Sequence, residues 1–318
     1  MTTNTDFGKA FEYACMMSIY EYVRDAGADV SMVASPALNT AQRAFDSLDA
    51  DDQEEMKDAA DTAVGLIVPL EPQLLNGDDT LELAIASDAV AIGADGDVRD
   101  VLCMRPDWCI GLSCKHNHEA LRHPRITEGK DFGRDWMRIP CSREFIDEIT
   151  PITDSLISYG RNRVQWNTIP NKQQDYYYPI LSAYLDEIRR MCNANADVPA
   201  RLLHYFFGAN DFYKVVMKSS EESTTIEGFN MSGTLNQPCG RIRPRTRVPL
   251  LRMPTRLLDA DFKSGSMTTI VLAFDGGWTI SMRLHNKDRI ARPTSLAWDV
   301  NLIGLPTGTY MNTHYWDE

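Results

Sequence analysis

The sequence predicts an α+β protein, in which helices precede a small mixed sheet, more helices follow, and the C-terminal part is rich in β structure. Three observations support this prediction. Residues 6–68 place apolar side chains at helical spacing. Short strand-like runs lie between residues 81 and 115, and residues 223–318 combine strand-like runs with hairpin turns. We therefore expect an acidic helical region (1–78), a core with a helical insertion (79–222) and a β-rich region (223–318).

The N-terminal region is expected to form helices separated by short breaks. Ser35 offers a cap, and Pro36 a first-turn proline, for one of them. Another begins after a break at residues 48–52 and stops near Pro69. Beyond this region we expect strands at 81–92, 98–104 and 109–115, then a short helix from Asn117 to just before Pro124.

Residues 141–219 again show helical spacing. An interruption is expected at Pro151, because proline lacks the amide hydrogen that a helix interior uses. The amphipathic stretch 199–218 is expected to be one of these helices. The β-rich region should contain a hairpin, formed by residues 267–274 and 278–285 around the turn Asp275-Gly276-Gly277.

The composition limits the class of protein. With 43% apolar residues among 318, the chain can bury a substantial core. Its apolar runs are far shorter than the ~18 residues that indicate a membrane span. The N-terminus shows no basic segment followed by an apolar one, as a secretory signal would. The 7 cysteines are odd in number and scattered, which favours free thiols. We expect a cytoplasmic protein with no membrane partner.

The charge is distributed unevenly, although the net value is −13. Residues 1–96 contain 19 acidic and 4 basic side chains, whereas residues 97–318 contain 26 acidic and 28 basic ones. No acidic residue lies between Gly228 and Leu258. A polyanion such as DNA would be repelled by the first third and attracted to part of the remainder. The acidic third is equally explained as a surface that keeps the protein soluble.

The stretch from Asp97 to Arg125 predicts a hairpin that ends in a cluster of polar side chains. Residues 106–107 suit the centre of a turn. If the strands fold back there, Asp100 lies opposite Ser113. Lys115, two residues beyond Ser113, then points to the same face, so that Asp100 and Lys115 become diagonal neighbours.

A carboxylate beside a lysine at the end of a hairpin suits phosphodiester cleavage. The carboxylate can hold Mg²⁺, which prefers oxygen ligands, polarises the scissile phosphate and helps to generate hydroxide. The lysine can orient the attacking water or neutralise charge in the transition state. This arrangement resembles the PD-(D/E)xK nuclease superfamily, in which an Asp on one strand is followed by an acid-x-Lys on the next. We therefore expect a mixed-sheet PD-(D/E)xK nuclease core flanked by helices, with Asp100, Ser113 and Lys115 in its catalytic site.

Ser113 stands where that pattern has its second acid, and serine is a poor metal ligand. A second carboxylate is therefore expected from elsewhere. Glu119, at the start of the next helix, is the first choice, because in several members of the superfamily a helix supplies this group. The alternatives are Glu82, Asp88 and Asp97.

Other interpretations of this stretch remain open. An Asp–Lys cross-strand pair is often a surface salt bridge that contributes little. The letters His116-Asn117-His118 match the name of the HNH nucleases, but those residues are spread over a ββα unit in that family. The nearby cysteines and histidines lack the Cys-x2-Cys spacing of zinc sites and are better explained as small buried residues.

Several blocks of the sequence together resemble the HaeIII-type restriction endonucleases. The blocks are GDVRDVLCMR at 96–105, IGLSCKHNHEALRHPR at 110–125, KDFGRDW at 130–136, FNMSGTLN at 229–236 and GGWTISMRLHN at 276–286. The likeness covers roughly residue 80 to the C-terminus. It implies a Mg²⁺-dependent enzyme that cleaves double-stranded DNA within the palindrome GGCC, in partnership with a cognate DNA methyltransferase. It also places His116 and Asn117 beside the catalytic pair, where they could orient the phosphate or the water, or simply cap the following helix.

Candidate DNA contacts lie in the β-rich region. In an extended segment Arg241, Arg243, Arg245 and Arg247 would all point to one side, as suits phosphates, although a charged edge strand that avoids aggregation explains them too. Arginine also pairs with guanine in the major groove. The remaining candidates for base contact are Arg283, His285, Asn230 and Asn236.

The sequence therefore supports three hypotheses. The first is a type II restriction endonuclease acting as a homodimer, since a palindromic target implies two-fold symmetry. The second is a non-catalytic DNA-binding protein, and the third is a structure-specific repair nuclease. Digestion of plasmid DNA would distinguish them. Discrete fragments would favour the first hypothesis, an absence of strand breaks the second, and random cleavage the third.

Overall fold

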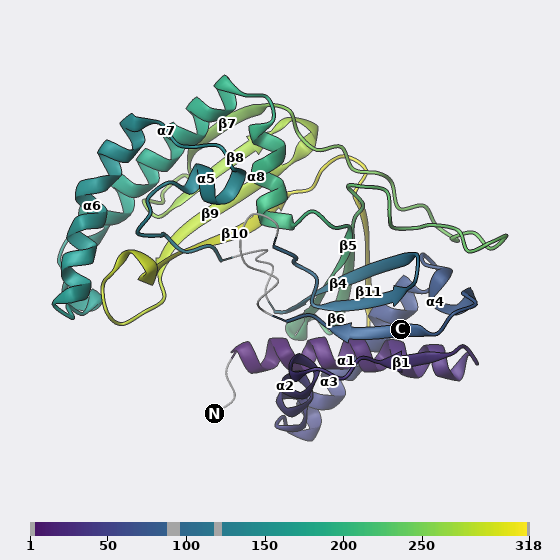
Figure 1. Ribbon diagram of the computed structural model, residues 1–318. Helices are drawn as coiled ribbons and strands as arrows, with labels where there is room; N and C mark the ends of the chain where they lie inside the picture. The colour runs from purple at the N-terminus through teal and green to yellow at the C-terminus, as the bar shows by residue number, and fades with distance from the viewer. Residues whose placement is uncertain (1–3, 88–95, 118–122, 317–318) are drawn as a thin grey trace.

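The computed structural model describes residues 4–87, 96–117 and 123–316 (Figure 1). The helices are α1 Asn4–Asp25, α2 Pro36–Asp46, α3 Ala50–Ile67, α4 Gln73–Asn76, α5 Phe132–Met137, α6 Arg143–Arg161, α7 Tyr178–Ala194 and α8 Val198–Phe207. The strands are β1 Val30–Met32, β2 Leu81–Ile85, β3 Val101–Arg105, β4 Trp108–His116, β5 Phe212–Lys218, β6 Ser223–Phe229, β7 Leu257–Phe262, β8 Thr269–Phe274, β9 Thr279–Asn286, β10 Leu296–Gly304 and β11 Tyr310–Tyr315. The predicted α+β class is confirmed.

A mixed sheet of seven strands forms the centre of the molecule, in the order β1-β2-β3-β4-β5-β6-β11. Most neighbours are antiparallel, but β1 and β2 run parallel, as do β4 and β5. The strands come from all three predicted segments, because β1 belongs to the acidic region and β11 to the C-terminal one. The sequence pattern did not predict β1, which is only 3 residues long.

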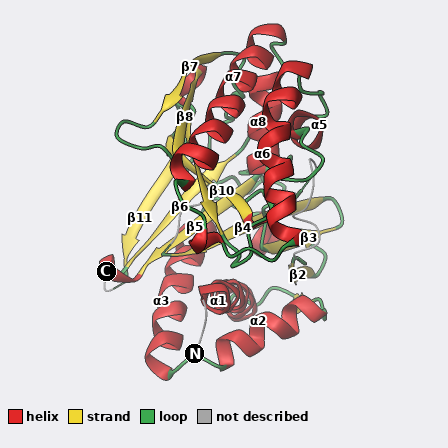
Figure 2. Cartoon of the chain, turned by 90° about the vertical axis from the view of Figure 1, so that its left-hand side faces the viewer, coloured by secondary structure: helices red, strands yellow, loops and turns green. Residues whose placement is uncertain are grey.

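The N-terminal helices cover one face of this sheet (Figures 1 and 2). The predicted cap of α2 is confirmed, because the Ser35 hydroxyl accepts a hydrogen bond from the Leu38 amide at 3.1 Å and Pro36 begins the helix. Asp49 caps α3 in the same way. Helix α1 packs against β2, β3 and β4, and α3 against β5, β6 and β11. Their buried side chains join those of the sheet in one apolar cluster.

A second, antiparallel sheet has the order β10-β9-β8-β7. Figure 2 shows α6, α7 and α8 against one face of it. The apolar cluster between them includes Trp298, which lies beside Tyr184 with ring centroids 5.0 Å apart. The predicted hairpin of residues 267–274 and 278–285 is confirmed as β8 and β9. The other face of this four-stranded sheet is covered by none of the described helices and carries polar side chains.

Two predictions for the middle of the chain are wrong. The stretch 199–218 is not one helix, since α8 ends at Phe207 and β5 follows. Gly208 makes the break with φ +79, a backbone conformation that favours glycine. Helix α6 also runs through Pro151 without interruption. The short helix expected after Asn117 falls mainly on residues 118–122, outside the described part of the chain.

Candidate active site

The hairpin of β3 and β4 has the predicted register. Met104 pairs with Cys109 across the turn, and Val101 pairs with Leu112. The Asp100 amide donates to the Leu112 carbonyl at 2.7 Å, so the ladder continues as far as Asp100. The turn at residues 106–107 was therefore sufficient to align the two strands.

Asp100 and Lys115 meet at the end of this hairpin. The ammonium Nζ of Lys115 lies 3.4 Å from Asp100 Oδ2, and the two side chains are 18% and 24% exposed. The Cys114 amide donates to the same oxygen at 2.8 Å, which fixes the carboxylate. All the side-chain contacts of Asp100 with described residues involve Oδ2, which leaves Oδ1 for a ligand as far as the described chain goes. Ser113 is buried, and its hydroxyl lies 3.5 Å from Asp100 Oδ2, beneath the pair.

A third ionisable group at this site was not predicted from the sequence. Glu12 of α1 is 7% exposed, and its carboxyl group interacts electrostatically with Asp100 and Lys115. Burial is the larger cause and the charge of Asp100 the smaller one, and together they raise the pKa of Glu12 to about 8. Lys9 opposes this shift through an ion pair of 3.1 Å. A glutamate among the apolar residues 10–19 was the available signal, but only tertiary packing brings it to the hairpin.

The other acidic candidates lie elsewhere or outside the described residues. Asp97 is held by Arg99, with Nη2–Oδ2 at 2.6 Å, and by Asn210, with Nδ2–Oδ2 at 3.0 Å. Glu82 pairs with Met104, whereas Asp100 bonds to Ala86, four residues further along the chain. Asp88, His118 and Glu119 belong to the segments that the structure does not describe.

His116 ends β4, Asn117 follows it, and both side chains are held in place. The His116 ring stacks on Phe7 of α1, with centroids 5.1 Å apart, and burial lowers the pKa of its imidazole. Asn117 has a left-handed backbone, φ 51. Its amide oxygen accepts from the Ser219 amide at 2.9 Å, and its amide nitrogen contacts His116 Nε2 at 3.1 Å. Asn117 therefore ties the end of β4 to the end of β5.

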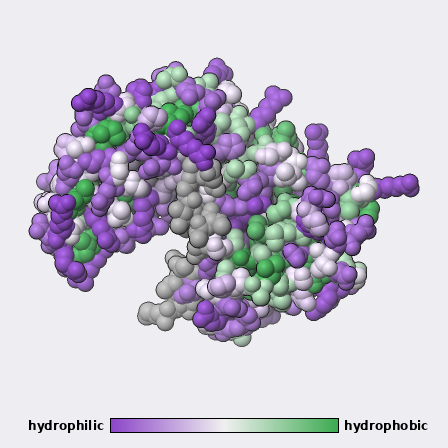
Figure 3. Space-filling model, viewed as in Figure 1, coloured by the Kyte–Doolittle hydropathy of each residue, from purple (hydrophilic) through white to green (hydrophobic). Residues whose placement is uncertain are grey.

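A cleft of about 600 Å³ opens beside the pair. One wall consists of Lys115, His116 and Asn117, and the opposite wall carries Arg283, His285, Lys287, His123 and Asp299. In Figure 3 the surface is hollowed between the upper helical part and the N-terminal helices, and hydrophilic side chains border the hollow on its upper side. The structure thus brings two of the predicted DNA-contact residues, Arg283 and His285, into the same cleft as Lys115.

The other predicted DNA contacts lie outside this cleft. Four arginines are exposed on the segment between β6 and β7, which turns sharply at Cys239–Ile242 rather than forming a strand: Arg241, Arg243, Arg245 and Arg247. Asn230 and Asn236 bond to backbone groups that hold this segment. For Asn236 these are the Leu70 and Thr246 carbonyls, both at 2.9 Å.

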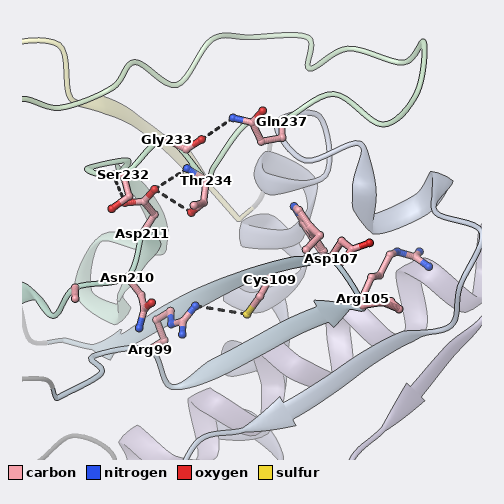
Figure 4. A pocket seen from close by; sticks show the side chains of 13 residues that line it. Arg99, Arg105, Asp107, Cys109, Asn210, Asp211, Ser232, Gly233, Thr234 and Gln237 are labelled. Atoms are coloured by element: carbon pink, nitrogen blue, oxygen red, sulfur yellow. Dashed lines mark hydrogen bonds between the residues drawn. The ribbon is translucent and has the colours of Figure 1, made fainter.

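A second cavity, of about 610 Å³, lies near the β3–β4 turn (Figure 4). Neither Asp100 nor Lys115 lines it. Asp211 closes one side by accepting hydrogen bonds from the amides of Met231, Ser232 and Thr234, each at 2.7 Å. Arg99 contacts Cys109 Sγ at 3.5 Å on the other side. These groups bond mainly to one another and do not converge on a reacting centre.

Among the described residues, no group of three or more His, Cys, Asp or Glu side chains is placed to hold a metal ion. Two carboxylates, Asp100 and Glu12, nevertheless fit Mg²⁺. This ion takes one or two protein carboxylates and fills its remaining positions with water and substrate phosphate. Also within the described chain, no helix is long and apolar enough to cross a membrane.

The fold and the Asp–Lys pair define a nuclease core of the PD-(D/E)xK type. Comparison with known proteins gives the family. The model for the HaeIII restriction endonuclease matches residues 8–306. The type II restriction enzyme HaeIII of Haemophilus aegyptius is 33% identical over 318 residues, covering 99% of both chains. No solved structure matches the chain. The chain belongs to the HaeIII restriction endonuclease family, and is by class a type II site-specific deoxyribonuclease.

Proposed function

We propose that this enzyme makes Mg²⁺-dependent double-strand cuts in DNA at a short palindrome, with GGCC as the first candidate. The observation that supports the metal chemistry is the proximity of Asp100 and Glu12 to Lys115, which lines the cleft. The candidate target rests on the family likeness. The protein would act in the cytoplasm beside a DNA methyltransferase that protects the same site.

Asp100 and Glu12 would hold the metal ion, which supplies Lewis-acid stabilisation of the scissile phosphate. The Cys114 amide keeps the Asp100 carboxylate fixed beside Lys115. The Lys115 ammonium would donate hydrogen bonds to a phosphate oxygen or to the attacking water, and so stabilise the charge that develops in the transition state. His116, stacked on Phe7, would form the adjoining wall and hold the water or phosphate in position.

The exposed arginines of the segment between β6 and β7 would contact phosphates. Two copies related by a two-fold axis would place one catalytic site on each strand of a palindrome. Light scattering of the free protein and of its DNA complex tests this dimer: a complex with one copy per palindrome would contradict it.

Digestion of plasmid DNA with Mg²⁺ tests the main proposal. Wild-type protein should give discrete fragments. Lys115→Ala should slow cutting by roughly 10²–10⁴-fold, the usual contribution of such a group, while Lys263→Ala, an exposed lysine, is the control. Glu12→Gln should raise the Mg²⁺ concentration needed for half-maximal rate, whereas Glu21→Gln on the same helix should not. Random smears would instead favour a structure-specific repair nuclease, and binding without strand breaks a non-catalytic protein.

A further inference from the structure

The helix-free face of the four-stranded sheet is polar and forms the cleft wall opposite Lys115. Along β9, Ile280, Met282 and Leu284 are buried under the helices. The alternating residues of the same strand, such as Arg283 and His285, point the other way. This face therefore presents hydrogen-bonding groups on a rigid sheet, at the position where a DNA duplex would lie against the catalytic pair.

Arg283 is the most exposed of these groups and has an acidic partner behind it. It pairs in register with Asp299 of β10. The guanidinium Nη2 lies 3.6 Å from Asp299 Oδ2, and the arginine side chain is 56% exposed while the aspartate is 16% exposed. His123 Nδ1 lies 3.4 Å from the other carboxylate oxygen. The half-buried acid thus holds the arginine from behind, and no other described residue forms an ion pair with the guanidinium, which lines the cleft.

The acid also indicates which DNA group the arginine would meet. A phosphate approaching Arg283 would meet the negative charge of Asp299 close by, and the two would repel each other. The edge of a guanine is neutral and offers two acceptors, O6 and N7, spaced for bidentate arginine. The exposed arginines at 241–247 differ, because no acidic residue lies between Gly228 and Leu258. They suit phosphates, whereas Arg283 suits a base.

The chain that continues from β4 pairs with this wall at residues 124–126. The Ile126 amide donates to the Leu296 carbonyl at 3.0 Å. The Trp298 amide donates to the Pro124 carbonyl at 2.8 Å. The chain that leaves Lys115 therefore becomes an extra pairing partner of β10. A base contact made at Asp299 and Arg283 would accordingly be held at a defined position relative to the scissile phosphate.

We propose that Arg283 reads a guanine of the target in the major groove, and that Asp299 is the positioning residue that orients it. A pair of β-strands can enter that groove, as β9 and β10 would here. The inference rests on the proposed DNA cleavage and assigns its sequence specificity to one side chain.

A cycle that combines a protein variant with a base analogue tests the contact. Once digestion has mapped the site, each guanine is replaced in turn by 7-deazaguanine, which lacks the N7 acceptor. At one guanine the analogue should slow single-turnover cleavage by wild-type protein roughly 5- to 150-fold, the discrimination of a bidentate contact. Arg283→Ala should cleave both duplexes at equal rates. Binding measured with Ca²⁺ in place of Mg²⁺ gives the same comparison for a variant that cuts too slowly.

Three further variants make the result specific. Arg256→Ala removes the same charge from the start of β7 and should keep the full wild-type analogue effect. Asp299→Asn should weaken binding of the normal duplex more than binding of the analogue duplex. Asp299→Glu should restore part of the wild-type preference for the normal duplex. A merely structural loss would lower the affinity for both duplexes equally. The proposal is overturned if Arg283→Ala shows the wild-type analogue effect at every guanine. If wild-type protein gives no discrete fragments, the proposed function itself has failed.

Discussion

A buried carboxyl group remote from the catalytic pair should make the stability of this protein depend on pH. Glu71 is 0% exposed. Its Oε1 accepts hydrogen bonds from the Tyr213 hydroxyl and the Asn236 amide, both at 2.6 Å, whereas its Oε2 has no partner. Burial raises the pKa of Glu71 from 4.5 to about 7, and the two hydrogen bonds only partly oppose this shift.

The direction follows from the raised pKa. The folded protein binds the proton more tightly than the unfolded chain does, so stability is highest below the unfolded value of 4.5 and falls as pH rises through about 7. A difference of this size corresponds to about 3 kcal/mol, lost between those two pH values. Glu71→Gln resembles the protonated form in shape and hydrogen bonding and should not lose this free energy.

Urea unfolding of wild-type protein and Glu71→Gln at several pH values from 5 to 8 measures the effect. From pH 5 to pH 8, the free energy of unfolding of the variant should rise relative to that of wild type by about 2–3 kcal/mol. Subtracting the two free energies cancels the contributions of the other titrating groups. Glu82→Gln, an exposed acid on β2, is the matched control and should show no such trend. A free-energy difference between wild type and Glu71→Gln that stays constant with pH would refute the reasoning.

Three further predictions concern packing, capping and DNA binding. Gly111→Ala should lower the free energy of unfolding by about 1–3 kcal/mol in urea titrations, because an added Cβ would lie 2.2 Å from Arg99 Cδ; unchanged stability would show that Arg99 can move aside. Ser142→Ala should cost about 2 kcal/mol in the same assay, since the hydroxyl caps α6 and bonds to the buried Glu187; Ser155→Ala is a comparison on the same helix. Arg243→Ala should reduce the slope of log binding constant against log salt concentration by about the amount that one phosphate contact contributes. A slope equal to that of wild type would exclude a phosphate contact at Arg243.

The hairpin could be predicted from sequence because its signals are local. The turn at residues 106–107 determines which residues of β3 and β4 face each other, and the positions of Asp100 and Lys115 follow from that alignment. Strand β5 was missed for the opposite reason. It is buried on both faces between β4 and β6, so residues 212–218 show no alternation. A continuous apolar run after an amphipathic helix cannot be told from more helix by periodicity alone.

Polar residues in connecting segments were harder to interpret. Asn236 stands in a block that resembles a DNA-cutting family, so a base contact was a reasonable expectation. In the structure its side chain satisfies backbone groups of residues 70, 246 and 248. The same amide chemistry serves a base edge or a peptide group equally well. Only the path of the surrounding backbone shows which groups an asparagine meets.

The second carboxylate shows why a linear motif gives an incomplete active site. A carboxylate at position 113 is absent, and helix α1 brings one from the other end of the sequence. Two contacts fix where it arrives: Phe7 stacks on His116 at 5.1 Å, and Cys15 lies in hydrogen-bonding contact with Cys114. Glu12 lies between these two points on the helix. Both contacts are to the end of β4, and the pKa of Glu12 responds to the charges of Asp100 and Lys115 there. The acidic N-terminal region thus contributes a side chain to the site as well as a cover for the sheet.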